Sequence, residues 1–294
     1  MIIYSFATRP DFLLGQLFPK ARVLNASPFE DGIHIPMHND NPADGDLDEI
    51  GIWLFHLNIS RSDKWFRDRQ SVLSRIQVAG YRIVNGGITD ILKTTIQQHN
   101  CQLGLPTVTM LDDDEPDTQV IVKTNYNYGA VGESWLNRSQ LEALGLVDIS
   151  TCSVKAFDEY YCCRFEEVDY SVRADSRLVV ERYVENPEGK FYRFYRCGTR
   201  AVLSEIICDR KIKKMRPGLP RKNWYYLFDA PESDSPIVMN AIRFCRAIDL
   251  EFGALDLAVD ESAVPYIIDV NPTPGWGSET QSDILSFLRE GFKT

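Results

Sequence analysis

Hydrophobic and polar positions along the first 85 residues predict a small α/β unit. Three apolar runs have the length of short strands, and they lie at 2–7, 50–57 and 81–85. Between the last two, an apolar face over 62–79 predicts a helix that ends at Gly80. Residues 25–49 carry seven acids together with Gly and Pro, which is typical of a long loop. Strand, helix and strand in this order indicate a parallel βαβ arrangement.

The remaining chain predicts further helices and a set of antiparallel strands. Helices are expected at 89–102, 139–145, 235–248 and 282–292. Strands are expected at 119–124, 178–184, 190–196 and 201–208, and the last three are expected to form an antiparallel meander. No stretch approaches the ~18 consecutive apolar residues of a membrane helix, so no membrane partner is expected.

Two apolar segments near the C-terminus predict a hairpin that carries two aspartates. Its strands are expected at 253–260 and 264–270. If the hairpin folds symmetrically about 262–263, Asp256 lies opposite Asp269, and Asn271 points the same way as Asp269. Opposed carboxylates repel each other, so a cation is expected between them, and two carboxylates with an amide oxygen suit Mg²⁺ that also holds phosphates. The alternative is a surface hairpin with its acids in water.

A second candidate site follows the strand at 119–124, near whose end Lys123 lies. The loop directly after this strand contains two glycines three residues apart, Gly129 and Gly132. A backbone without side chains can approach phosphate closely, and Lys123 would add a point charge. The loop lacks the Gly-Lys-Ser/Thr ending of a Walker A sequence, so an ordinary hairpin turn remains an alternative.

The net charge indicates which kinds of partner to expect, and the cysteine content indicates which cellular compartment to expect. The net charge of -10 argues against a nucleic-acid partner, whose phosphates favour a basic surface. Seven basic residues nevertheless lie within 209–222, which fits either a pocket for an anionic substrate or a solvated loop. The seven cysteines form no Cys-x-x-Cys pair and no signal peptide begins the chain, so we expect reduced thiols in a cytoplasmic protein.

Several motifs, taken together and in order, resemble the ATP-grasp superfamily, in its ribosomal-protein glutamate ligase and glutathione synthetase branch. The motifs are Asp90-Ile-Leu-Lys93, Gly104-Leu-Pro106, Val120-Ile-Val-Lys123 with the glycine loop, Val179–Val184, Phe191-Tyr-Arg193, Gly253-Ala-Leu-Asp256 and Ile268-Asp-Val-Asn-Pro272. The resemblance implies a mixed α/β and α+β chain with the ATP-grasp fold, in which two α+β lobes clamp ATP. It implies three parts: a small α/β domain at 1–85, a first lobe at 86–178 and a C-terminal lobe at 179–294.

The same resemblance implies which residues form the site. Those implied to bind ATP are Lys93, Lys123, Gly129, Gly132, Glu181, Arg182, Tyr183, Val184 and Glu188. The lysines would contact phosphates, the 181–184 strand would lie against adenine, and Glu188 would take the ribose hydroxyls. The implied catalytic residues are Arg193 and, as the best candidate for a second active-site arginine, Arg210. The implied ligands of two Mg²⁺ ions, for which Mn²⁺ can substitute, are Asp256, Asp269 and Asn271; the family generally has Glu where this chain has Asp269.

The resemblance implies an ATP-dependent, ADP-forming ligase that joins a carboxylate to an amine through an acyl phosphate. Its substrates would be ATP, the carboxylate of an amino acid or peptide, and an amine acceptor, and homodimers are common in the family. One alternative is a small-molecule kinase on the same scaffold, with the basic 210–222 segment holding a phosphorylated substrate. The other is a nucleotide-binding module without catalysis, in which Asp269 is a sign of decay.

Overall fold

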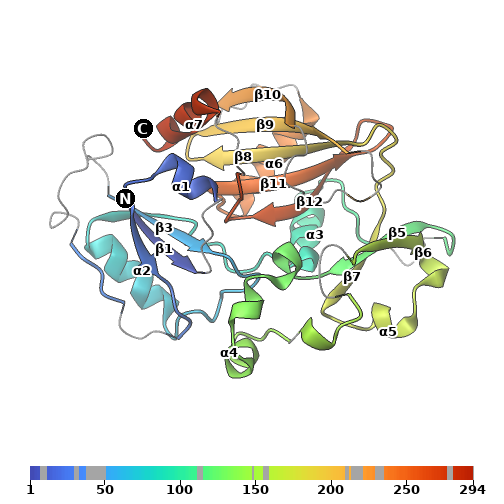
Figure 1. Cartoon of the computed structure of the whole chain (residues 1–294), viewed down its shortest axis with the longest axis horizontal. Helices are drawn as coiled ribbons and strands as arrows, with labels where there is room; N and C mark the ends of the chain where they lie inside the picture. Colours follow the sequence, from blue (N-terminus) through green and yellow to red (C-terminus); the bar gives the residue numbers. More distant parts are fainter. Residues whose placement is uncertain are drawn as a thin grey trace.

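Three β-sheets organise the chain in a computed structural model (Figure 1). The structure describes residues 1–6, 12–29, 33–37, 51–110, 115–147, 149–154, 159–208, 212, 221–228, 235–276 and 281–293. Arg210 and most of the basic 210–222 segment lie outside these residues, as do the side chains of 221 and 222. Within the described part, every helix is too short or too polar to cross a membrane.

The first sheet is parallel and belongs to the N-terminal part. Its strands, in the spatial order β2-β1-β3-β4, are β1 (Ile2–Phe6), β2 (Arg22–Asn25), β3 (Gly51–Leu57) and β4 (Tyr81–Val84). The helices here are α1 (Leu13–Leu17) and α2 (Arg69–Val78). The predicted parallel βαβ unit is confirmed, but its helix begins later than expected because Asp68 caps it by accepting a hydrogen bond from the backbone N–H of Ser71.

The second sheet has five antiparallel strands, and we call it the central sheet. In the order β10-β9-β8-β11-β12 they are β8 (Lys190–Cys197), β9 (Arg200–Ile207), β10 (Arg221–Phe228), β11 (Phe252–Val259) and β12 (Pro265–Asn271). One face is covered by α3 (Lys93–Gln102) and α6 (Pro236–Ala247), whose apolar residues share a core with Leu255, Leu257 and Ile267. On the opposite face, Tyr195 and Ala254 share a core with residues of β1, β3 and α7 (Ser282–Arg289).

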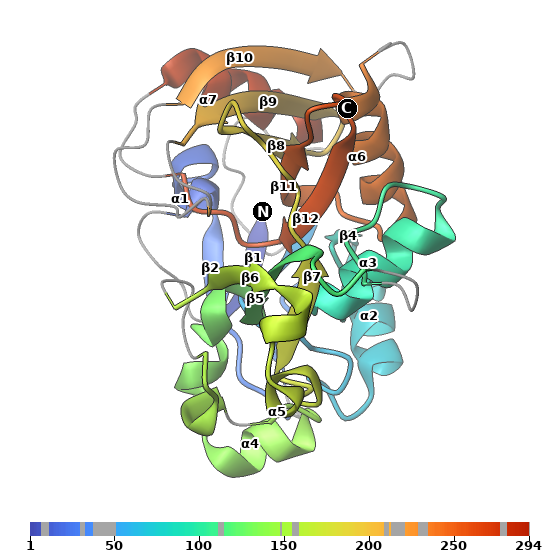
Figure 2. The same cartoon turned by 90° about the vertical axis from the view of Figure 1, so that its right-hand side faces the viewer.

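The third sheet is small and antiparallel, with the order β6-β5-β7. Its strands are β5 (Gln119–Thr124), β6 (Tyr161–Arg164) and β7 (Leu178–Arg182). The short helices around it are α4 (Arg138–Ala143) and α5 (Tyr170–Arg173), with single turns η2 (Asn127–Ala130), η3 (Glu133–Trp135), η4 (Ile149–Thr151) and η5 (Phe165–Glu167), and η6 (Glu290–Phe292) follows α7. Figures 1 and 2 both place this sheet beyond the β12 edge of the central sheet, with α3 near the junction.

The predicted three-stranded meander is wrong in its first strand. β8 and β9 pair as expected, but β7 pairs with β5 in the small sheet and not with β8. Just after β7, the backbone N–H of Tyr183 donates to the carbonyl of Gln119, so the chain stays on the small sheet before it crosses to β8. The proposed boundary between residues 178 and 179 therefore falls inside the small sheet, whereas a boundary after Arg182 would leave that sheet whole.

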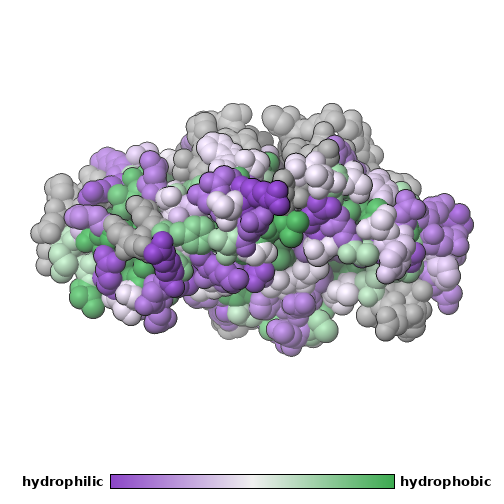
Figure 3. Space-filling view, turned by 90° about the horizontal axis from the view of Figure 1, so that it is seen from below, coloured by the Kyte–Doolittle hydropathy of each residue, from purple (hydrophilic) through white to green (hydrophobic). Residues whose placement is uncertain are grey.

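The described surface seen in Figure 3 is mostly hydrophilic, and its apolar residues form small separate groups. Soluble proteins ordinarily expose some apolar area of this scattered kind. The described residues on this face therefore form no broad apolar surface that would point to a docking partner.

Candidate active site

A row of three charged side chains crosses the central sheet. Arg193 on β8 is the register partner of Asp256 on β11, which in turn is the partner of Asp269 on β12. The predicted pairing of Asp256 with Asp269 is thus confirmed. Nη1 of Arg193 lies 3.4 Å from each carboxylate oxygen of Asp256, and the arginine side chain is only 4% exposed. The row lies on the face that carries Tyr195 and Ala254, opposite α3 and α6.

Arg193 keeps its charge in this buried position. Burial alone lowers the pKa of the guanidinium, but the negative charge of Asp256, followed by Tyr195, Asp269 and Tyr128, raises it above its usual value. The guanidinium also lies over the Tyr195 ring, 5.3 Å from its centroid. Arg193 is therefore a fixed, desolvated positive charge beside two carboxylates.

Two buried lysines lie on the small-sheet side of the same site. Lys93 opens α3, and its Nζ donates to the backbone carbonyl of Tyr126 at 2.6 Å. Lys123 on β5 forms an ion pair with Glu181 on β7, with 2.5 Å between Nζ and Oε2. Both lysines are therefore buried cations that are already bonded within the protein and have little contact with water.

Lys93 interacts electrostatically with acidic groups of both the central sheet and the small sheet. Burial lowers the pKa of this lysine, but nearby negative groups outweigh burial and raise it; the contributors are Asp269, Tyr160, Glu181 and Glu133. These groups come from the central sheet, the small sheet and the loops beside it. Lys93 thus belongs to one electrostatic cluster that spans both sheets.

Three buried polar atoms in this cluster have no hydrogen-bond partner within the described part of the chain. They are Nε of Arg193, Oε1 of Glu181 and Oε2 of Glu133. An unpaired buried polar group costs about 1–3 kcal/mol, and native proteins leave few of them. These three atoms can form hydrogen bonds with water or with a polar ligand.

The proposed metal ligands are hard oxygen donors on neighbouring strands, and Oδ1 of Asn271 also accepts hydrogen bonds from the backbone N–H and the hydroxyl of Thr273, at 2.9 and 3.2 Å. Asp256 and Asp269 face the same side of neighbouring strands, and Asn271 follows two residues after Asp269. In the described residues no group of three or more His, Cys, Asp or Glu side chains is arranged to hold a metal, so a cation here would depend on two carboxylates and the Asn271 amide oxygen. Such a partial set suits Mg²⁺, which normally keeps water or phosphate oxygens as its other ligands.

The glycine loop is attached to the N-terminal part of the chain. A Cβ on Gly132 would overlap the backbone carbonyl oxygen of Asn58, so this glycine is explained by contact with protein backbone. Gly129 lies between Tyr128 and Ala130 in three consecutive left-handed conformations, with φ values of 46°, 63° and 63° for residues 128, 129 and 130. The loop is therefore a specific, strained turn, as expected near a functional site.

Glu133 is a buried acid that the sequence motifs did not identify as part of the site. Its Oε1 accepts a hydrogen bond from the backbone N–H of Ser60 at 2.7 Å, and the Ser60 hydroxyl accepts one from the N–H of Asn127 at 2.8 Å. Burial raises the pKa of Glu133, while the bonds to Ser60 and the charge of Lys93 lower it in part. Its position beside a glycine loop was the available signal, but acids after a turn are usually solvated.

The residues predicted to contact adenine and ribose differ in their burial and in their hydrogen bonds. Glu181 is buried in the cluster, whereas the backbone N–H groups of Arg182 and Tyr183 donate to Val108 and Gln119, respectively. Val184 is half-buried just beyond them. Glu188 is exposed on the following turn and pairs with Lys190, so the structure does not bring it into the buried cluster.

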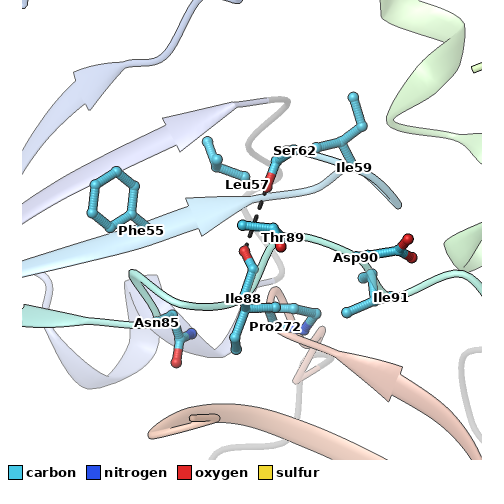
Figure 4. Close-up of a pocket in the computed structure, with 10 residues that line it drawn as sticks. All are labelled: Phe55, Leu57, Ile59, Ser62, Asn85, Ile88, Thr89, Asp90, Ile91 and Pro272. Carbon is cyan, nitrogen blue, oxygen red and sulfur yellow. Dashed lines mark hydrogen bonds between the residues drawn. The ribbon is translucent and has the colours of Figure 1, made fainter. Parts of the chain in front are cut away.

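A narrow crevice adjoins the end of β12 (Figure 4). It lies between the ends of β3 and β4, the 85–91 segment, and Pro272, which follows Asn271 directly. Apolar side chains such as Phe55 and Ile91 form much of its wall, and the Ser62 hydroxyl donates to the carbonyl of Ile88 across it at 3.4 Å. The charged residues of the cluster do not line this crevice, and Pro272 is its link to the end of β12.

Comparison with known proteins identifies the fold. No model of a known family and no curated protein matches the sequence. Among solved structures, the ATP-grasp ligase PsnB complexed with minimal precursor, Mg and ADP is 11% identical, with a TM-score of 0.51 over 99% of this chain and 96% of that chain. The RimK domain protein ATP-grasp from Sphaerobacter thermophilus is 10% identical, with a TM-score of 0.47 and full coverage of both chains. Macrocyclase MdnC from Microcystis aeruginosa, bound with precursor peptide MdnA, is 11% identical, with a TM-score of 0.48 over 98% of this chain and 97% of that chain.

Proposed function

We propose that this chain, which has the ATP-grasp fold, is an ADP-forming carboxylate–amine ligase of the ribosomal-protein glutamate ligase and glutathione synthetase branch. One observation carries the proposal: a buried cluster places Lys93 and Lys123 on one side and the Arg193–Asp256–Asp269 row on the other. Phosphoryl transfer needs charge neutralisation and in-line positioning more than covalent help from the protein. The cluster supplies both kinds of charge from rigid strands and a helix.

ATP would bind between the small sheet and the central sheet. Lys93 and Lys123 would contact its phosphates, with Gly129 and Gly132 shaping the adjacent loop, and the 181–184 segment would lie against adenine. Because the N–H groups of Arg182 and Tyr183 are already engaged, adenine recognition would depend on the Glu181 side chain and on Val184. Glu188 would reach the ribose only by leaving its exposed pair with Lys190, and exposed pairs of this kind contribute little to stability.

Asp256, Asp269 and Asn271 would hold Mg²⁺, as two ions for which Mn²⁺ can substitute. When bound, the metal supplies neutralisation of the phosphate charge during transfer. The side chain of Asp269 is shorter than the Glu that the family generally has, and its register with Asp256 keeps it within the same row. Arg193 would add a fixed positive charge for the transferred phosphoryl group or the acyl phosphate. Arg210 stays the candidate for a second such arginine.

The reaction would proceed in two steps. A substrate carboxylate oxygen attacks the γ-phosphorus of ATP, which forms an acyl phosphate and releases ADP. An amine nitrogen then attacks the acyl carbon, the C–O bond to phosphate breaks, and the amine gives up a proton as the amide forms. An amino acid or a peptide would supply the carboxylate, and the PsnB complex with a precursor favours a peptide. The glycine loop and the segments around the crevice beside Pro272 would keep water away from the acyl phosphate.

The first test is ADP and phosphate release by the full chain with Mg²⁺ and ATP, against a pool of amino acids and short peptides, with mass spectrometry of the products. A product equal to the two substrates minus water supports the ligase. A substrate that gains one phosphate identifies a kinase instead, and tight ADP binding without turnover by any substrate identifies a binding module. In parallel, Asp269→Asn should abolish turnover while the thermal unfolding midpoint of the protein without nucleotide stays close to that of the unmodified chain.

A further inference from the structure

The hairpin that carries the acidic residues contains one extra residue. From the turn outward, Leu257 pairs with Ile267, whereas the next pair is Asp256 with Asp269. Ile268 is therefore the additional residue of a β-bulge on β12. Bulges commonly turn side chains toward a new direction and occur next to active sites.

The bulge decides which face of the sheet Asp269 occupies. Ile267 and Val270 both belong to the core under α3 and α6, although they are three residues apart. Strict alternation from the turn would place Ile268 opposite Asp256 and would place Asp269 opposite Leu255 on that apolar face. The extra residue instead returns Asp269 and Asn271 to the face that carries Asp256.

Two buried amide side chains of α3 hold the strand at this bulge. Nε2 of Gln97 and Nδ2 of Asn100 both donate to the carbonyl oxygen of Ile267, at 3.1 and 3.0 Å. Nδ2 of Asn100 also donates to Oε1 of Gln97 at 3.2 Å, which links the two amides. Both residues are buried, on a helix whose other buried residues include Ile96 and Lys93. β12 is the edge strand of the sheet and the bulge also interrupts its ladder, so its buried carbonyls take donors from outside the sheet.

We propose that Gln97 and Asn100 are positioning residues that hold the Ile268 bulge and thereby direct Asp269 and Asn271 into the metal site. The inference rests on the proposed function, because it concerns the same metal ligands. Lys93 begins the same helix, and the negative charge of Asp269 raises the pKa of this lysine. The helix α3 thus positions both Lys93, the proposed phosphate-binding lysine, and, through the bulge, the strand that carries the proposed metal ligands.

The test compares two substitutions at neighbouring positions of α3. Gln97→Met removes the amide from the bulge at nearly constant side-chain length, and Gln98→Met makes the same change on the exposed side of the helix. Asn100→Leu is the second test variant, because it leaves in place the hydrogen bonds that the Thr107 hydroxyl and the Val108 N–H donate to Oε1 of Gln97. The readout is the Mg²⁺ concentration that gives half of the Mg²⁺-dependent rise in thermal unfolding midpoint at saturating ADP, and Mn²⁺ binding by electron paramagnetic resonance checks it directly.

Gln97→Met and Asn100→Leu should each raise this Mg²⁺ midpoint by about threefold to tenfold, the range expected for one lost buried hydrogen bond. ADP affinity in EDTA should stay unchanged, and Gln98→Met should behave like the unmodified chain. If the test variants lower the unfolding midpoint but keep the normal Mg²⁺ midpoint, the amides are merely structural and the inference is overturned. If Asp256→Asn and Asp269→Asn also keep the normal Mg²⁺ midpoint, the proposed metal site itself is wrong, which is a separate failure.

Deletion of Ile268 supplies an independent check. Without this residue, Asp269 follows Ile267 directly and pairs with Asp256 by ordinary alternation, so no bulge has to be held. In that shortened chain, Gln97→Met should change the Mg²⁺ midpoint by less than twofold. An effect as large as in the full-length chain would show that Gln97 acts by another route. The full-length comparison above decides the matter by itself if the shortened chain does not fold.

Discussion

Replacement of Gly132 by Ala tests how firmly the glycine loop is fixed to the N-terminal part. The backbone of Gly132 has φ -63° and ψ -44°, a conformation that alanine adopts without strain. The added methyl group is therefore the whole perturbation. It would lie 2.7 Å from the carbonyl carbon of Asn58 and closer still to the carbonyl oxygen. The carbonyl oxygen would be at 1.6 Å, whereas Cβ contacts in proteins are essentially never shorter than 3.0 Å, so the loop must move by at least about 1.4 Å.

The expected loss of folding stability depends on the hydrogen bonds that this movement of the loop would break. The loop holds Ser60 through Glu133 Oε1 at 2.7 Å and through the N–H of Asn127 at 2.8 Å. Overpacking costs about 1–3 kcal/mol, and each lost hydrogen bond adds about 0.5–1.5 kcal/mol. We expect Gly132→Ala to lower the free energy of unfolding by about 3 kcal/mol and to raise the KM for ATP, because the displaced loop lies beside Lys93.

Urea denaturation measures the stability change, and Gly15→Ala is its matched control. Gly15 lies within α1, and a Cβ added there meets no heavy atom within 4 Å. That change should stabilise the chain by about 0.4–1 kcal/mol, because alanine restricts the unfolded state. Opposite signs for the two substitutions are expected. Equal stability of Gly132→Ala and the unmodified chain would refute the placement of the loop against Asn58.

Three further predictions concern the buried charges. Lys123→Met should cost about 3–5 kcal/mol of stability, because it leaves Glu181 charged and unpaired, and Lys123→Met with Glu181→Leu should recover most of that loss in urea denaturation. Burial raises the pKa of Glu133, so the folded state binds more protons than the unfolded one and the contribution of Glu133 to stability falls as pH rises above about 4.5. Glu133→Gln should therefore gain stability relative to the unmodified chain as the pH rises above about 4.5, and a difference that is independent of pH would contradict this. Arg193→Lys should lower kcat by about 100-fold with little change in the KM for ATP, and a change confined to KM would exclude a role in transfer.

Much of the architecture was predictable because hydrophobic periodicity is local. The parallel βαβ unit, the strands at β5, β8 and β9, and the helices α3, α6 and α7 all follow from apolar patterns and their Gly or Pro boundaries. The strand β6 was missed, because the four residues Tyr161–Arg164 are short and largely exposed and show no alternation. The assignment of β7 to the wrong sheet has another cause, since pairing partners are chosen by long-range contacts that no local pattern records.

The candidate site also contains residues that the sequence identified and residues that it did not. Acids and basic residues in motif positions were found, and the structure gathers Lys93, Lys123, Glu181, Arg193 and the acidic hairpin into one cluster. Glu133 was not found, because only the fold brings Ser60 and Lys93 to it and makes its burial tolerable. Glu188 illustrates the converse, since its motif position is satisfied while its side chain lies in solvent. A motif therefore locates a residue along the chain, whereas burial and pairing depend on segments distant in sequence.

The pairing of Asp256 with Asp269 was predicted correctly from an incomplete premise. A plain hairpin about 262–263 gives this pair, but the observed strands leave the turn one residue out of that register, and the Ile268 bulge restores it. No local pattern marked the bulge. Gln97 and Asn100 are amides on the buried face of a helix, and buried amides need hydrogen-bond acceptors. Because β12 is the edge strand of its sheet, its carbonyls can supply such acceptors with or without a bulge. The register of this hairpin therefore depends on how the helix and the strand pack together, which neither segment records by itself.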